Sequence, residues 1–135
     1  MPDVDRGDHW ELDVLGTELS LMKVSWSVAL VLTRPGGSLE LTVESTFALD
    51  GPGARWFLDP SEEPAGLAPV LGLLRRPARR LHVFKDGRLE LDLDAGWRIS
   101  ADPDVDYESW NITADSGARF VALPGGGVAY WGPDS

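Results

Sequence analysis

The sequence predicts a mainly β domain of the α+β class, built on an antiparallel β-meander with one short helical excursion. Two observations predict this class. Segments with alternating apolar and polar residues recur along the chain, and glycine, proline and aspartate separate them at intervals of about ten residues. Helix signals are confined to the middle of the chain. We expect the 135 residues to form a single domain whose strands make a twisted sheet or a partial barrel.

The first predicted strand is the longest. Apolar residues recur along residues 19–32 and become continuous over residues 28–32. This pattern is typical of a centrally placed strand, and it places Trp26 in the core. A change in the phase of the alternation near Met22 and Lys23 indicates a β-bulge.

A hairpin is predicted after this strand. Residues 34–37 read Arg-Pro-Gly-Gly, which favours a tight turn. Leucine and valine then alternate with glutamate and threonine over residues 39–44, as in a strand with one buried face. We therefore expect the two strands to pair in an antiparallel manner.

The helical excursion is expected between residues 59 and 74. Asp59 is a candidate N-cap, and Pro60 and two glutamates favour a helix start. Later prolines and a glycine interrupt the pattern, so we expect one short turn at residues 60–63 and a second short helix near residues 67–74. The segment 50–65 is then the longest irregular region.

Trp56 and Phe57 lie in this irregular region. A large apolar pair at such a place either closes the end of the sheet or is offered to a partner. Closing the sheet is the preferred interpretation, because aromatic side chains bury much surface. Trp56 stays a secondary candidate for partner binding.

The second half of the chain predicts a meander. Residues 81–84 and 89–94 are joined by a turn that contains Asp86-Gly87, a pair that tolerates positive φ. A second glycine turn leads into residues 97–100. Three more strand-like segments follow, at residues 107–113, 119–123 and 128–131.

The charge balance is the strongest functional observation. The chain has 22 acidic and 12 basic residues, two histidines, no cysteine and a net charge of −10. Such a chain attracts cationic partners and repels nucleic acid and anionic membranes. We therefore expect a basic protein as the partner, and neither nucleic acid nor a membrane.

We expect the protein to be cytoplasmic. The apolar run over residues 28–32 is far shorter than the roughly 20 residues that cross a bilayer. The first residues are acidic where a signal peptide would be basic, and the absence of cysteine fits a reducing compartment.

An acidic segment begins at Asp102. Asp102, Asp104 and Asp106 have the spacing of the first ligands of a calcium loop. Tyr107 then replaces the required glycine, and Thr113 replaces the bidentate glutamate. The segment is therefore interpreted as a solvated acidic loop that is available to a partner.

Few residues offer catalytic or metal chemistry. His9 and His82 have no nearby companion at metal-ligand spacing, and no nucleophile motif is present, so we expect neither a metal nor a cofactor. Two pairs of neighbouring carboxylates, Glu108 with Asp106 and Asp92 with Asp94, leave a carboxylate-dependent hydrolase as an alternative. An enzyme is nevertheless not the expected function.

Four arginines interrupt the acidic character of the chain: Arg75, Arg76, Arg79 and Arg80. Four guanidinium groups in six residues could clamp a phosphate or a carboxylate. Cations at the carboxyl end of a helix are the simpler interpretation, because they are favoured there by the helix dipole. The cluster is thus a candidate anion site with a structural alternative.

A family resemblance rests on the last third of the chain. Its motifs are a strand that follows Asp86-Gly87, the segment from Tyr107 to Trp110, and Pro-Gly-Gly before Trp131. These motifs resemble a family of small bacterial domains of unknown function, and the resemblance extends over most of the chain. It implies a fold and no activity. The Tyr-Glu-x-Trp element also resembles one in several immunity proteins of bacterial toxin systems.

These observations predict an acidic binding protein, most concretely an immunity or antitoxin-like inhibitor. The residues expected to bind the partner are Asp102, Asp104, Asp106, Tyr107 and Glu108, with Trp56 second. The first alternative is a small-ligand module with a cavity in the sheet. The sequence leaves the oligomeric state open, because an edge strand such as Val128–Trp131 can be free, covered or paired with a second copy.

Overall fold

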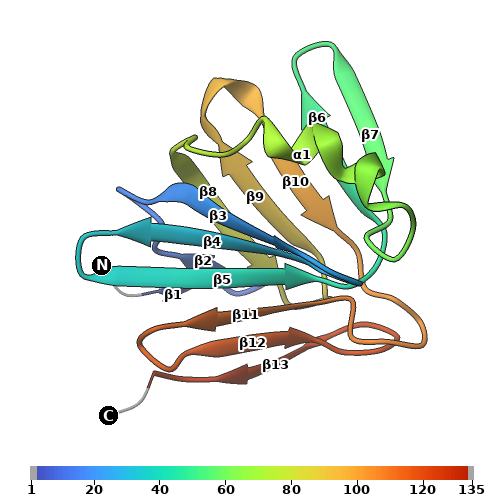
Figure 1. The fold of residues 1–135 in the computed structure, drawn as a ribbon. Coiled ribbons are helices and arrows are strands. Elements are labelled where there is room, and N and C mark those ends of the chain that lie inside the picture. Colours follow the sequence, from blue (N-terminus) through green and yellow to red (C-terminus); the bar gives the residue numbers. More distant parts are fainter. Residues whose placement is uncertain (1–2, 134–135) are drawn as a thin grey trace.

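The structure, a computed structural model, describes residues 3–133. Within this range the strands form two antiparallel sheets, one of seven strands and one of six, that lie face to face (Figure 1). The described residues contain one short α-helix, α1, which overlaps β10 beside β6 and β7 in the view of Figure 1. The predicted class, mainly β with one helical excursion, is therefore confirmed.

The seven-stranded sheet has the order β1-β2-β8-β9-β10-β6-β7. It contains the predicted meander, because β8, β9 and β10 are consecutive in the chain and adjacent in the sheet. The bounds of its strands are β1 Val4–Asp5, β2 His9–Leu12, β6 Phe47–Gly51, β7 Ala54–Leu58, β8 Ala78–Phe84, β9 Leu89–Leu93 and β10 Arg98–Ala101.

The six-stranded sheet has the order β13-β12-β11-β5-β4-β3. Its bounds are β3 Glu18–Val24, β4 Val28–Arg34, β5 Gly37–Val43, β11 Trp110–Ala114, β12 Arg119–Ala122 and β13 Val128–Trp131. The predicted hairpin is confirmed, since Arg34 pairs with Gly37 at the turn between β4 and β5.

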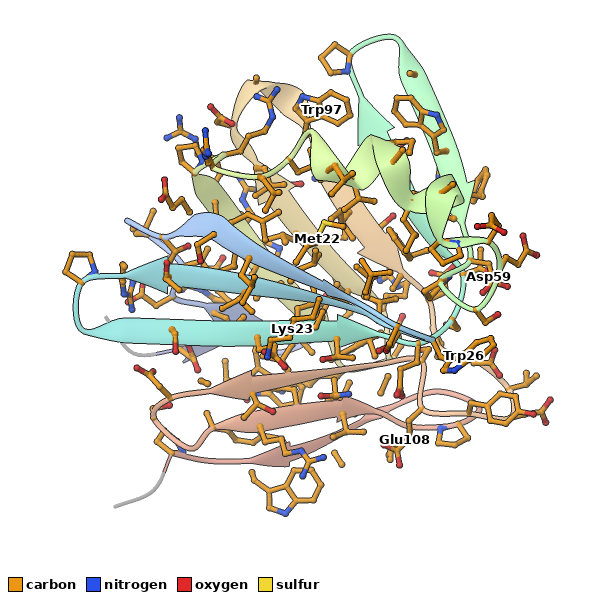
Figure 2. The ribbon with its side chains drawn as sticks, viewed as in Figure 1. Met22, Lys23, Trp26, Asp59, Trp97 and Glu108 are labelled. Carbon is orange, nitrogen blue, oxygen red and sulfur yellow. The ribbon has the colours of Figure 1, made fainter. Side chains whose placement is uncertain are left out.

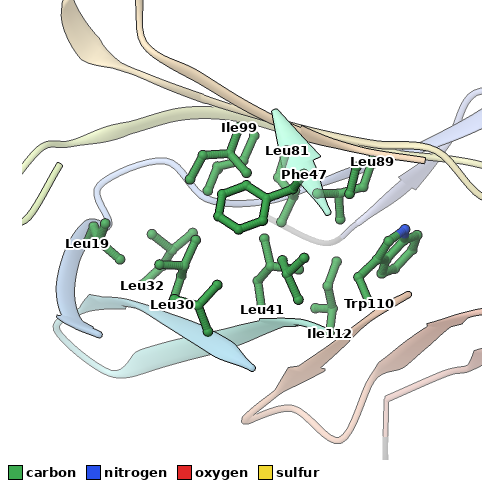
Figure 3. Packing of buried hydrophobic residues seen from close by; sticks show 14 of the residues in the cluster. Leu19, Leu30, Leu32, Leu41, Phe47, Leu81, Leu89, Ile99, Trp110 and Ile112 are labelled. Carbon is green, nitrogen blue, oxygen red and sulfur yellow. The ribbon is translucent and has the colours of Figure 1, made fainter. Parts of the chain in front are cut away.

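The core lies between the two sheets (Figure 3). From Leu39 onward in β5, and throughout β9, every second residue is a buried leucine or valine, and the residues between them carry carboxylates or hydroxyls toward the outer face. Trp110, Phe47 and Phe120 are the largest fully buried or nearly fully buried side chains. Each buried leucine contributes about 1.5–3 kcal/mol, so this layer is the main stabilising element.

The predicted long strand over residues 19–32 is wrong. It is two strands, β3 and β4, joined by a turn in which the Ser25 amide donates to the Ser27 carbonyl oxygen at 2.9 Å. Trp26 lies at the tip of this turn with 79% of its surface exposed, so its placement in the core was also wrong. The bulge lies between Leu19 and Leu21, earlier in the chain than expected.

The region 50–65 is not irregular throughout. Residues 47–58 form the hairpin of β6 and β7, whose tight turn contains Pro52 and Gly53. Gly53 has φ +74°, a conformation that glycine adopts without steric cost. The sequence signal for this hairpin was weak because apolar and polar residues do not alternate regularly along β7. Its residues Ala54, Arg55 and Phe57 are all exposed.

The helical excursion contains the predicted turn, in which the Glu62 amide donates to the Asp59 carbonyl oxygen at 3.2 Å, and its helical part begins slightly earlier than predicted. A short 3₁₀ segment, η1, covers Pro64–Leu67 and continues into α1 at Ala68–Leu71. No helix forms over residues 60–63; Asp59 instead accepts hydrogen bonds from the Ser61 amide at 2.9 Å and the Ser61 hydroxyl at 2.7 Å. Glu63 is extended, with ψ 122°, because the residue before a proline avoids the helical region.

Candidate functional site

Strand register brings several loops to one end of the six-stranded sheet. Val28 pairs with Val43, and Val43 pairs with Trp110. Val28 directly follows the turn at residues 25–27, and Trp110 directly follows the loop at residues 102–109. The predicted acidic loop therefore lies at the same end of the sheet as the tip that carries Trp26.

The acidic loop has a defined backbone. One carboxylate oxygen of Asp104 accepts hydrogen bonds from the amides of Asp106 at 2.8 Å and Tyr107 at 3.2 Å. The carbonyl oxygen of Asp104 accepts a bond from the Gly125 amide at 2.7 Å. The hydrogen bonds of Asp104 thus shape the loop and attach it to the glycine turn between β12 and β13.

The two ends of the loop are also fixed. The Ser109 hydroxyl donates to the Asp102 carbonyl oxygen at 2.9 Å, and the Glu44 amide donates to the Ser109 carbonyl oxygen at 2.8 Å. The buried indole of Trp110 donates to the Gly87 carbonyl oxygen at 2.9 Å. These bonds tie the loop to both sheets, and they explain why β11 begins at Trp110 and not at residue 107 as predicted.

Most of the predicted side chains of this loop face solvent. Asp102, Asp106 and Glu108 are exposed, and Tyr107 has 71% of its surface exposed. Trp26 and Glu108 lie toward the same side of the view in Figure 2. The structure therefore places two exposed aromatic rings and several carboxylates at one end of the molecule.

The carboxylates of this end differ in their partners. Among residues 3–133, no lysine or arginine lies within ion-pair distance of Asp106 or Glu108. In the neighbouring turn, Asp86 accepts a bond from the Arg88 guanidinium at 2.9 Å. We use "acidic end" for Trp26, Glu44, Asp86 and the loop 102–109.

Comparison with known proteins places the chain in a family. Residues 10–132 match the profile of a family described only as a family of unknown function, DUF6188. The chain belongs to this family. No curated protein and no solved structure matches it. Membership in DUF6188 agrees with the predicted resemblance to a small domain of unknown function, and it supplies no activity.

In this DUF6188 chain, Trp56 does not join the acidic end. It is half-buried on β7 and stacks on Trp97, with ring centroids 6.1 Å apart and an interplanar angle of 14°. The Arg76 guanidinium lies 5.6 Å from the centre of the Trp97 ring. Trp56 thus packs on the edge of the core, as preferred for the pair of Trp56 and Phe57, but the interpretation is wrong for Phe57, which is 69% exposed.

The four arginines occupy separate environments in the DUF6188 chain. Arg76 forms an ion pair with Asp94 at 3.5 Å, in addition to its contact with Trp97. Arg75 adopts φ 74° and donates its amide to the Leu19 carbonyl oxygen at 2.7 Å. Arg79 and Arg80 line a surface groove elsewhere. Side-chain contacts are thus given for the Arg76 guanidinium, whereas the bond of Arg75 is made by its backbone. The interpretation as helix-end cations is wrong for Arg79 and Arg80, which lie on β8.

The neighbouring carboxylates Asp92, on β9, and Asp94, directly after it, are engaged in ion pairs. Asp92 accepts bonds from Arg98 at 2.5 and 3.0 Å, and Asp94 is paired with Arg76. A hydrolase would need two carboxylates that face one substrate. The two aspartates are instead held by different arginines.

Within residues 3–133, no helix is both long and apolar enough to cross a membrane.

The structure brings together two histidines that the sequence did not connect. Glu11 on β2 pairs with His82 on β8, and the ring centroids of His9 and His82 are 4.5 Å apart. Burial, and next the charge of His9, lower the pKa of His82, so this imidazole is neutral at neutral pH. Sequence spacing could not reveal this cluster, because β2 and β8 are far apart in the chain.

Proposed function

We propose that this protein binds a basic protein partner through its acidic end. The observation that carries the proposal is that two exposed aromatic rings, Trp26 and Tyr107, lie at the same end of the six-stranded sheet as the carboxylates of Asp106 and Glu108, which have no ion pair to a described residue. Aromatic residues are enriched among the side chains that dominate binding energy. Unpaired carboxylates supply the attraction to a cationic surface.

The rigidity of the loop supports this proposal. Asp104, Ser109 and Trp110 fix its backbone through hydrogen bonds, so little conformational entropy is lost when a partner binds. Pre-organised loops on a rigid sheet are a common place for binding residues. Tyr107 and Glu108 are the members of the Tyr-Glu-x-Trp element that a partner can reach, because Trp110 is buried.

An inhibitor of the immunity or antitoxin type is the most specific form of this proposal. Such a protein must bind its target tightly and quickly, and a net charge of −10 accelerates association with a basic protein. The two alternatives receive less support. Core side chains fill the space between the sheets. Of the carboxylates considered for a hydrolase, Asp92 and Asp94 are held in ion pairs, and Asp106 and Glu108 are exposed to solvent.

Affinity capture from the host lysate tests the proposal. The tagged wild type is compared with two pairs of matched variants: Trp26→Ala with Trp131→Ala, and Glu108→Gln with Glu18→Gln. Trp131 and Glu18 are exposed at the opposite end of the six-stranded sheet. Each capture is repeated in about 0.05 M and about 1 M salt, where the screening length falls to about 3 Å.

We expect one basic protein to bind the wild type and both control variants at low salt. Trp26→Ala and Glu108→Gln should each reduce its recovery, and high salt should reduce it for every variant. If a basic protein bound Trp26→Ala and Trp131→Ala equally well, its interface would have to lie outside the acidic end. Failure to capture any protein at either salt concentration would contradict the proposal.

A further inference from the structure

We propose that His9, Glu11 and His82 form a binding site for one divalent transition-metal ion of the zinc type. The three side chains offer two imidazole nitrogens and one carboxylate oxygen, and these ligand atoms all lie within 4.8 Å of one another. Two histidines and one glutamate are a donor set that binds zinc and leaves a coordination position for water or substrate. This site is separate from the acidic loop and does not depend on the proposed partner.

Strand pairing explains why the three side chains meet. His9 and Glu11 are two residues apart on β2, so they project from the same face of the sheet. His82 lies directly opposite Glu11 on β8. On the other face, Leu12, Leu81 and Val83 are buried in the core. The paired strands β2 and β8 therefore position all three ligands before any ion binds.

The distances between the ligand atoms are close to those expected around a bound zinc ion. Oε1 of Glu11 lies 3.9 Å from Nε2 of His9 and 3.6 Å from Nε2 of His82. In a tetrahedral zinc site with bonds of about 2.0–2.1 Å, ligand atoms are about 3.3 Å apart. Small side-chain rotations bring the three atoms to this separation, and no strand has to move.

Hydrogen bonds outside the cluster orient two of the ligands. Nδ1 of His9 lies 2.6 Å from a carboxylate oxygen of Asp8. With its proton on Nδ1, His9 presents the lone pair of Nε2 to the cluster, as metal-binding histidines with a carboxylate partner do. Oε2 of Glu11 accepts a bond from Arg6 at 3.3 Å, so Oε1 is the oxygen that faces the imidazoles.

One nitrogen of the cluster lacks a hydrogen-bond partner among residues 3–133. Nε2 of His9 is buried and makes no hydrogen bond to any described group. A buried polar atom without a partner is destabilising, and native proteins usually satisfy it. A metal ion bound to Nε2 would satisfy this atom. Glu11 and His82 also line a surface groove of about 310 Å³, which gives an ion a path from solvent.

Metal titration of the protein tests the site, with any histidine tag removed and bound metal stripped by a chelator. Zn²⁺ and Ni²⁺ are added separately, and binding is followed by calorimetry and by the shift in Tm. The variants are His82→Gln, Glu11→Gln and Asp8→Asn. Glu90→Gln is the matched control, because Glu90 lies beside His82 on β9 and is not one of the proposed ligands. The Tm of each metal-free variant checks its fold.

We expect the wild type and Glu90→Gln to bind one ion per chain and to show a higher Tm with metal. His82→Gln and Glu11→Gln should weaken binding by about 100-fold or more, and Asp8→Asn by about 10-fold to 100-fold. Equal affinity of the metal for the wild type and His82→Gln would overturn the site, because the ion would then be bound by carboxylates elsewhere on the protein. No binding to the wild type at millimolar metal would also overturn it.

Discussion

The indole nitrogen of Trp110 donates a hydrogen bond to the carbonyl oxygen of Gly87, 2.9 Å away, across the interface between the two sheets. The donor belongs to the first residue of β11, and the acceptor lies in the turn between β8 and β9. This bond fixes the end of the acidic loop to the seven-stranded sheet. A single side chain thus links the core to the surface that we propose as a binding site.

Trp110→Phe should destabilise the protein by about 2–4 kcal/mol. The change leaves the buried Gly87 carbonyl oxygen without its donor and opens a small cavity. Urea denaturation measures the free energy of unfolding. Trp131→Phe is the control, because Trp131 is 53% exposed and its replacement should change stability by less than about 0.5 kcal/mol. Equal stability of the two variants would contradict the proposed role of this bond.

Trp26→Ala should leave the free energy of unfolding within about 0.5 kcal/mol of the wild-type value. Trp26 is 79% exposed at the tip of a turn, so its truncation removes little buried surface. Urea denaturation distinguishes this result from that of a core tryptophan, whose truncation costs about 3–5 kcal/mol. A large loss of stability would mean that Trp26 packs against the protein and is not available to a partner.

Gly51→Ala should destabilise the protein by about 1–3 kcal/mol. A Cβ atom at Gly51 would overlap the Trp97 ring, and contacts with Trp56 and Arg76 oppose a shift of that ring. In a Trp97→Leu background the same change should cost much less. The double-mutant cycle, measured by thermal or urea unfolding, therefore gives the coupling between the two positions. An unchanged cost in the Trp97→Leu background would exclude the overlap as its cause.

Asp86→Asn should reduce stability at neutral pH more than in acid. Partial burial opposes ionisation of Asp86, but hydrogen bonds from the amide and guanidinium of Arg88 outweigh it and lower its pKa below the usual 3.8. Because the folded pKa is the lower one, this carboxylate stabilises the fold above about pH 4 and loses that effect as the pH falls through the folded value. The side chain is largely exposed, so the difference at pH 7 should not exceed about 1 kcal/mol.

Unfolding of the wild type and Asp86→Asn at pH 7 and near pH 3 checks this window. The two proteins should differ at the higher pH and converge at the lower one. Arg88→Gln should narrow the same difference, because it removes the guanidinium donor to Asp86. A difference that is equally large at both pH values would show that the charge of Asp86 is not its cause.

Strands with one buried face could be predicted from the sequence. The alternation around Leu41 and Leu91 reports burial directly, and Asp86-Gly87 is a strong hairpin signal. Trp26 was assigned to the core because residues 24–28, Val-Ser-Trp-Ser-Val, keep the alternation of a strand through the turn, so that the two strands look like one. The hydrogen bond between Ser25 and Ser27 that reverses the chain there leaves no distinct pattern.

Of the two candidate sites, one could be predicted from the sequence and the other could not. The exposed acidic loop is contiguous in the chain, so its carboxylates and Tyr107 could be named from the sequence. The cluster of His9, Glu11 and His82 depends on the pairing of β2 with β8, which local spacing does not encode. Sequence reasoning therefore predicted no metal, and the geometry now supplies a reason to test for one.

The unpaired carboxylates of the acidic end give this end of the molecule a local negative field. Among residues 3–133, Asp106 and Glu108 make no ion pair at the acidic end, whereas Arg75 and Arg76 lie beyond the opposite end of β9, next to Asp94. In the field of a basic surface such a body experiences a torque before contact and turns its acidic end forward. Collisions are then productive more often than the size of the patch alone would allow, and added salt removes this advantage by shortening the reach of the field.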